Sequence, residues 1–179
     1  MIKHELIIPF GPEWWVYNIS TILIILAIVF IGKSLSTKKK QTLTICIGAF
    51  FIFEFVFMEL LHLYTGVWSL KDSLPLHLCS LMWFLSIYFF FTKKQWAFDM
   101  CLFIGMPGGI HSLLTPELTH GSNLIHKIDF FVGHGGLVLV PFYGIFVLKM
   151  WPHKYGWINS FIKLQVLVCC VGLANWILE

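Results

Sequence analysis

The sequence predicts an all-α polytopic membrane protein, an antiparallel bundle of six transmembrane helices with its N-terminus outside. Hydrophobic residues make up 58% of the 179 residues and charged residues 12%, against about 25% charged residues in soluble domains. Apolar stretches that approach the roughly 20 residues needed to cross a bilayer as a helix recur along the chain. The connections between them are short, so consecutive helices are expected to run antiparallel.

Six apolar stretches qualify, and we predict spans at residues 16–35, 42–67, 75–92, 95–115, 128–148 and 158–178. The first follows the paired tryptophans of "GPEWW", which suit a membrane interface. The second contains two acids, Glu54 and Glu59, and a histidine near its end, and the third begins at Pro75. The fourth contains "GMPGG" (105–109), which should break or kink a helix. The fifth contains "VGHGG" (132–136). The sixth ends with the chain, so residues 1–179 are either one compact transmembrane domain or a domain that lacks a C-terminal part.

Lysine supplies all of the fixed positive charge, because the chain has no arginine. Eight of the lysines lie in the first, third and fifth connections, whereas the N-terminus and the remaining connections hold three. Cytoplasmic loops are enriched in lysine and arginine, and this asymmetry places the N-terminus outside. Membrane topology therefore accounts for the net charge of +3, and nucleic acid is not an expected partner. The N-terminal segment has no small-residue cleavage site and is not a signal peptide.

Polar side chains occur at similar depth in five of the predicted spans. Such residues are costly within a membrane and are functional candidates by default. Counting along each span at about 1.5 Å per residue places them in the outer third of the membrane. They are Glu59, His62, Cys79, His111, His134 and Asn175. The alternative is that the ends of spans are wetter and tolerate polar residues better.

Helix geometry narrows this set. Glu59 and His62 are three residues apart and share a helix face, so the carboxylate could hold the imidazole. His77 and Cys79 point about 200° apart on a regular helix and cannot both face one site. Glu54 points elsewhere, and we expect it to make a structural hydrogen bond. The glycines of the fourth and fifth spans favour a pocket, but close helix packing explains them equally well.

Cys79 has two interpretations. A free cysteine is often a small buried hydrophobic residue, and the other four cysteines fit this description. They are Cys46, Cys101, Cys169 and Cys170. A nearby imidazole could instead draw off the Cys79 proton and give a thiolate that attacks an acyl carbonyl. Such Cys-His pairs are known in acyl transfer. The cysteine spacing forms no zinc-finger or CxxC motif, so no disulfide framework is expected.

Four motifs carry a resemblance to a known family. They are "LPLHLCSL", "GMPGGIHSLLTPEL", "FFVGHGGLVLVPFYG" and "LANWIL". From about the second span to its end, the chain resembles the YwaF family of bacterial integral membrane proteins, which is related to the eukaryotic TMEM164 group. The resemblance implies an acyltransferase that moves a fatty acyl chain onto a lysophospholipid with a cysteine and a histidine. The matching positions here are Cys79 and His134.

The leading hypothesis is therefore a lipid acyltransferase or acyl hydrolase of the cell membrane, with a membrane lipid as partner and no cofactor. Cys79 would be the nucleophile and His134 the general base. The supporting residues would be His77, Glu59, His62, His111 and Asn175, of which Asn175 would donate to an oxyanion.

Two alternatives stay open. The first is a zinc-dependent membrane hydrolase with His77, His111 and His134 as ligands, because three protein ligands plus water is the pattern of catalytic zinc. The second is a non-enzymatic transporter or ligand-binding protein that uses the broken fourth span as its binding site. The sequence predicts no oligomeric state.

Overall fold

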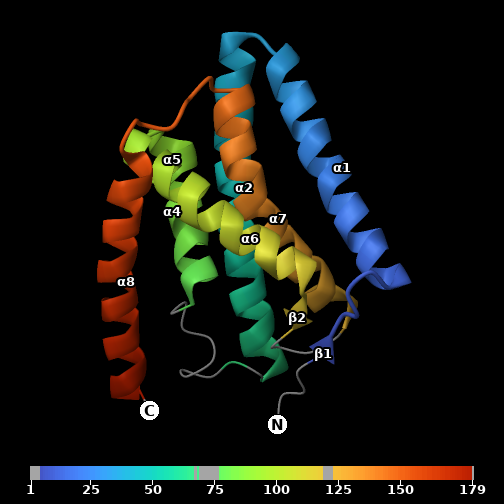
Figure 1. Cartoon of the computed structure of the whole chain (residues 1–179). Coiled ribbons are helices and arrows are strands. Elements are labelled where there is room, and N and C mark those ends of the chain that lie inside the picture. Colours follow the sequence, from blue (N-terminus) through green and yellow to red (C-terminus); the bar gives the residue numbers. More distant parts are fainter. Residues whose placement is uncertain (1–4, 67, 69–76, 119–122, 179) are drawn as a thin grey trace.

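The protein is described by a computed structural model that covers residues 5–66, 68, 77–118 and 123–178 (Figure 1). Its helices are α1 (Pro12–Ser34), α2 (Thr37–Thr65), α4 (Leu78–Thr92), α5 (Gln95–Met100), the π-helix η1 (Cys101–Gly105), α6 (Met106–Leu114), α7 (Leu124–Phe146) and α8 (Gly156–Leu178). Two short strands, β1 (Glu5–Leu6) and β2 (Glu117–Leu118), pair antiparallel. The predicted all-α class is confirmed for the described residues.

Five helical segments are long and apolar enough to cross a membrane, namely α1, α2, Gln95–Leu114, α7 and α8. The apolar helix α4 has 15 residues, which is about 22 Å at 1.5 Å per residue and shorter than a bilayer core of roughly 30 Å. The described part of the chain thus contains five candidate spans, and the sixth stays a prediction. The predicted start of the third span (75) and end of the second (67) lie outside the described residues.

The sequence predicted that "GMPGG" breaks or kinks the fourth span, and the predicted break is wrong, whereas the kink stays a prediction. The elements α5, η1 and α6 follow one another without interruption, so Gln95–Leu114 is one helical segment. Pro107 lies in the first turn of α6. A proline within a helix removes one hydrogen bond and crowds the carbonyl four residues earlier, which here belongs to Phe103. Because Phe103 lies in η1, the wider π-helical turn accommodates the proline and the helix continues.

The bundle has two distinct ends (Figure 1). The connections after α1, α4 and α7 lie at one end, which we call the lysine-rich end. The paired strands β1 and β2 lie at the opposite end, which we call the β-pair end. There Trp14 Nε1 donates to the Leu113 carbonyl at 3.0 Å, and Lys127 Nζ lies 2.7 Å from Glu13 Oε1. These contacts join the start of α1 to the end of α6 and the start of α7.

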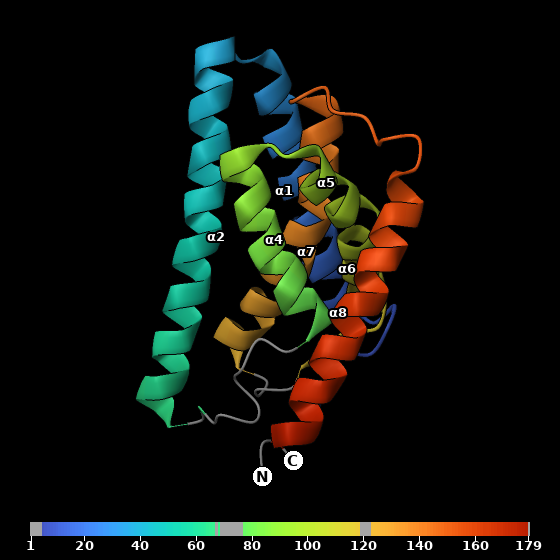
Figure 2. The ribbon, with the colours of Figure 1, turned by 90° about the vertical axis from the view of Figure 1, so that its left-hand side faces the viewer.

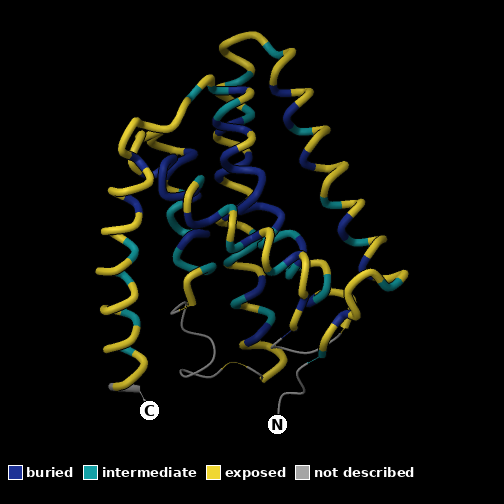
Figure 3. Tube along the Cα trace, viewed as in Figure 1, coloured by how far each residue is buried: buried dark blue, intermediate teal, exposed yellow. Residues whose placement is uncertain are grey.

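Helix α7 is at the centre of the bundle, as the buried positions in Figure 3 indicate. In an apolar stretch of 18 residues in α7, 56% of the residues are buried, whereas 6% are buried in the corresponding stretch of α8. Glycines permit the close approach of its neighbours. A Cβ on Gly135 would lie 2.5 Å from Thr21 of α1, one on Gly136 would collide with the Trp83 ring of α4, and one on Gly109 of α6 would lie 2.7 Å from a backbone oxygen of α7. Close helix packing therefore explains these three glycines.

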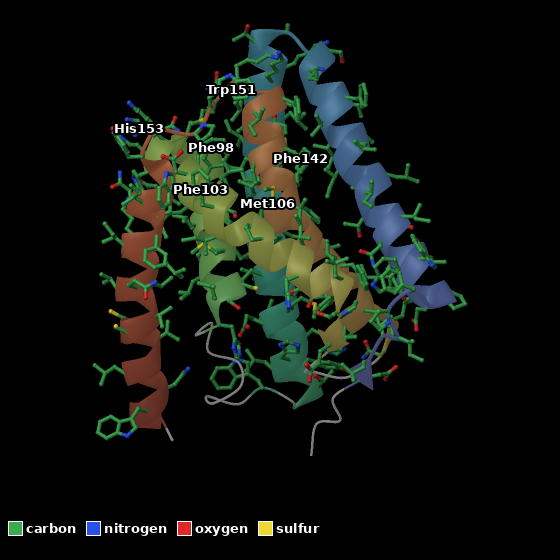
Figure 4. The ribbon with its side chains drawn as sticks, viewed as in Figure 1. Phe98, Phe103, Met106, Phe142, Trp151 and His153 are labelled. Carbon is green, nitrogen blue, oxygen red and sulfur yellow. The ribbon has the colours of Figure 1, made fainter. Side chains whose placement is uncertain are left out.

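Helix α8 lies at the edge of the bundle and contacts α5 and η1. Gly156 and Ser160, in its first two turns, are buried. Buried Asp99 of α5 accepts hydrogen bonds through Oδ1 from Gln95 Nε2 at 2.9 Å and from the His153 backbone N–H at 3.2 Å. A Cβ on Gly156, the first residue of α8, would lie 2.8 Å from the Asp99 carboxyl. A carboxylate at a helix N-terminus interacts favourably with the helix dipole. Asp99 thus fixes the start of α8, at the end where Figure 4 labels His153 and Phe98.

Candidate functional site

Cys79 lies in the first turn of α4, directly after the N-cap residue His77 and Leu78. Its thiol is half-buried and in hydrogen-bonding contact with Ser112 of α6. One turn before Ser112, a Cβ on Gly108 would lie 3.8 Å from Cys79 Sγ. The thiol therefore packs on α6, whereas His77 is exposed.

His134 lies in the middle of α7, and its ring packs against Phe130 with 4.2 Å between centroids. Its Nδ1 lies 2.8 Å from the Phe130 carbonyl oxygen. A carbonyl oxygen can only accept, so Nδ1 carries the proton of this hydrogen bond. In the neutral imidazole the lone pair is then on Nε2. The backbone fixes the tautomer that a general base acting through Nε2 requires.

Cys79 and His134 approach the same turn of α6. A Cβ on Gly108 would lie 3.8 Å from Cys79 Sγ, and a Cβ on Gly109 would lie 2.7 Å from the backbone oxygen of His134. Neighbouring residues on a helix point about 100° apart, so α4 and α7 reach this turn from different sides. The hydrogen-bonding partner of the thiol is Ser112. The two residues predicted to be catalytic thus lie around one helical turn, and their pairing stays a prediction.

A pair of carboxyl groups joins α2 to α7, and one of the two interacts electrostatically with His134. Glu54 of α2 is in hydrogen-bonding contact with Asp129 of α7, which is the structural hydrogen bond expected of Glu54. Two carboxyl groups can hydrogen-bond to each other only when one of them holds a proton. Asp129 also interacts electrostatically with His134. The candidate base therefore interacts with one member, Asp129, of an acid pair that joins α2 to α7.

A second group of imidazoles lies closer to the β-pair end. The rings of His62 in α2 and His126 in α7 stack with centroids 5.5 Å apart and planes 13° apart. Asn123 caps α7 through Oδ1, which accepts from the His126 backbone N–H at 3.0 Å and lies 2.7 Å from His126 Nδ1. Glu59 accepts a hydrogen bond from Trp68 Nε1 at 2.9 Å. These contacts link α2 to α7 and to residue 68, and a supporting role for Glu59 and His62 stays a prediction.

The last two predicted site residues lie on the surface of the bundle. His111 is exposed on α6, and its backbone carbonyl accepts from Thr115 Oγ1 at 3.1 Å. Asn175 is exposed on α8, where it lines a groove between α8 and the first turn of α4. Their supporting roles also stay predictions.

The described part of the chain gives no structural support to either of the two alternative functions. No group of three or more His, Cys, Asp or Glu side chains among these residues, His77, His111 and His134 included, is arranged to hold a metal ion. The transporter alternative relied on a broken fourth span, but the structure has a continuous helical segment there.

A model of the TMEM164 family matches residues 9–179. The chain belongs to the TMEM164 family. No curated protein and no solved structure matches it. Family membership and the five apolar helices together identify a multi-pass membrane protein.

In this TMEM164-family protein, the structure adds two residues to the candidate site that the sequence analysis did not select. Asp129 is an acid within an apolar span, and the rule that selected His134 could have selected it as well. Ser112 carries no such signal, because small hydroxyl residues are common at contacts between membrane helices. Its significance arises from the contact between α4 and α6, which the sequence of neither helix reveals.

Proposed function

We propose that this TMEM164-family protein is a lipid acyltransferase or acyl hydrolase in which Cys79 is the nucleophile and His134 the general base. Its partner is a membrane lipid with an ester-linked acyl chain. We also propose that it acts in the cell membrane and belongs to the bacterial YwaF branch of the family. No cofactor is required for the chemistry that follows.

The reaction proceeds through a thioester. The Cys79 proton passes to Nε2 of His134, and the thiolate attacks the carbonyl carbon of the lipid ester. The tetrahedral intermediate collapses, its C–O bond breaks, and the leaving alkoxide takes the proton from the imidazolium. The products are acyl-Cys79 and a lysolipid. The hydroxyl of an acceptor lipid, or of water, then attacks the thioester by the reverse proton path, which yields a new ester or a free acid and restores the thiol.

The observation that carries the proposal is the approach of Cys79 and the His134 backbone to consecutive residues of α6. The tautomer set by Phe130 supports it, because the lone pair of the neutral ring is then on Nε2. The thiol rests against Ser112 and must rotate about its Cα–Cβ bond to engage the base. Catalytic hydrogen bonds are often long in ligand-free enzymes and tighten in the substrate complex.

The acyl-enzyme provides the direct test. The purified protein in vesicles is given a phospholipid with an alkyne-tagged acyl chain, and protein-bound label is then read by intact mass. We expect one label that hydroxylamine removes, as a thioester requires. Cys79→Ala should abolish it, and His134→Ala should slow its formation about 10²–10⁴-fold, the range for loss of a general base.

Cys46→Ala is the matched control, because Cys46 is an exposed cysteine on another helix, α2. This variant should be labelled like the wild type. Label that survives in Cys79→Ala, or a labelling rate that does not depend on His134, would contradict the assignment.

A further inference from the structure

An apolar groove lies between α8 and the first turn of α4, the end of α4 that approaches α8 in Figure 2. Its volume is about 210 Å³. We call it the α4–α8 groove, and it is lined by Leu78, Leu167, Val168, Val171, Gly172 and Asn175. The α8 residues recur at intervals of three and four and therefore form one helix face.

The groove is oriented along the membrane-spanning direction of α8. From Asn175 to Leu167 it extends over eight residues, which is roughly 12 Å along the helix. Among the described lining residues Asn175 alone is polar, and it lies near the β-pair end of α8, whereas the other described lining residues are apolar. An acyl chain with a polar ester at one end has the same distribution of polarity.

The groove begins next to the candidate nucleophile. Leu78, its wall on α4, directly precedes Cys79 in the chain. The thiol contacts α6 at Ser112, so the groove and the reacting sulfur share the first turn of α4. A lipid whose carbonyl carbon meets Cys79 can place its apolar chain along α8 without crossing the closely packed core.

The attachment of α8 leaves this space open. Helix α8 contacts α5 and η1, and its first residue is fixed beside Asp99. Farther along, a Cβ on Gly172 would meet no atom within 4 Å. Lipid tails are as apolar as leucine side chains, so in a membrane such a space is filled by hydrocarbon.

We propose that the α4–α8 groove binds the acyl chain of the lipid substrate, with the ester between Cys79 and Asn175. This inference rests on the proposed function, because that function supplies the substrate. It adds the site of the chain and assigns Asn175 to hydrogen bonding with the ester. The bound chain lies on the face of α8 that points to α4, and its terminal methyl group points to the lysine-rich end.

Gly172 gives a variant that fills the groove without disturbing the core. Because a side chain at this position meets open space, Gly172→Phe should fold, and phenylalanine also favours a helix more than glycine does. Leu173→Phe is the matched control. It places the same ring on the neighbouring residue, which is 58% exposed and lies outside the groove lining.

Photo-crosslinking tests the groove without requiring turnover. Protein with Cys79→Ala, in phosphatidylcholine vesicles doped with a lipid that carries a diazirine in its acyl chain, is irradiated and its crosslinked peptides are mapped. We expect crosslinks at Leu167 and Val171 to exceed those at Leu173. Adding Gly172→Phe should lower this excess about fivefold or more, since the new ring occupies the space of the chain and overpacking of this kind weakens binding by about that factor at the least. Adding Leu173→Phe instead should leave the excess of crosslinks at Leu167 and Val171 unchanged.

Acyl-enzyme formation by the active protein gives the second measurement. Gly172→Phe should raise the KM for a long-chain phospholipid and leave labelling of Cys79 by a short activated acetyl ester unchanged. Crosslinks spread evenly around α8, an excess that Gly172→Phe does not reduce, or crosslinks that join two copies of the chain would each overturn the proposal. If the wild type forms no acyl-enzyme, the proposed function fails, while the crosslinking result still reports on the groove.

Discussion

Two pairs of polar residues within the apolar helices join α2 to α7. Glu54 contacts Asp129 between α2 and α7. Thr44 Oγ1 lies 3.0 Å from the Tyr143 hydroxyl between the same two helices, and both of these residues are fully buried. An unsatisfied polar group in hydrocarbon costs several kcal/mol, so each pair specifies how α2 packs on α7.

The acid pair predicts how single substitutions affect stability. Asp129→Ala removes one partner and leaves the Glu54 carboxyl without its hydrogen bond, at a cost of about 1–3 kcal/mol in the free energy of unfolding. In Asp129→Asn the amide can donate to Glu54, so the loss should be smaller. Unfolding in mixed micelles with increasing SDS measures both. Equal losses in the two variants would show that the hydrogen bond contributes little.

The sequence predicted which residues deserve attention, but not their partners. A histidine or an acid within an apolar span stands out without any structure, and His134 was found in this way, whereas Cys79 was selected by its depth and by the family resemblance. The contacts of Cys79 with Ser112 and of Glu54 with Asp129 join different helices. Such pairs depend on the rotation and depth of each helix, and helical periodicity gives neither relative to a neighbour.

At the scale of elements, the lengths of the apolar stretches predicted the positions of two membrane-spanning helices closely. The predicted segment 95–115 corresponds to Gln95–Leu114, and 158–178 corresponds to α8, Gly156–Leu178. Hydropathy locates such segments because the bilayer thickness fixes their length. It could not reveal η1, because a π-helical turn changes hydrogen bonding without changing composition. The proline that predicted a break lies in a continuous helical segment, one residue after the first residue of α6 and directly downstream of this turn.

Glycine packing around α7 predicts opposite outcomes for two glycines three residues apart. In Gly136→Ala the new methyl group would collide with the Trp83 ring, whereas a methyl group on Gly133 meets open space. Overpacking typically costs about 1–3 kcal/mol, so Gly136→Ala should lower the melting temperature in detergent, and Gly133→Ala should not. A similar melting temperature for both variants would contradict the close approach of α4 and α7.

At the scale of the whole molecule, the chain consists of a packed bundle and one peripheral helix. Helices α1, α4 and α6 surround α7, whereas α8 is held through α5 and η1. Glycine residues let the helices of the interior approach each other closely, whereas the α4–α8 groove lies at the edge of the bundle. A binding space at the edge of a bundle is accessible from the lipid phase, so a membrane lipid can enter it laterally without opening the core.

Asp99 controls the position of α8 in this arrangement. Asp99→Ala removes the acceptor for Gln95 Nε2 and the His153 N–H, and hydrogen bonds to a charged group contribute about 1.5–3 kcal/mol. Local opening of the first turns of α8 should then become about tenfold more frequent or more. Hydrogen exchange measured by mass spectrometry should accelerate in the α7–α8 connection and at the start of α8, but not in α7.

Asp99→Asn is the matched control, because it keeps an oxygen acceptor and loses only the charge at the helix N-terminus, a contribution of about 0.3–1 kcal/mol. Its exchange should lie between those of the wild type and Asp99→Ala. Acceleration across α7 as well would mean that α8 is part of the cooperative core and not a separately attached helix. The α4–α8 groove could then not change its width independently, and lipid entry would require opening of the bundle itself.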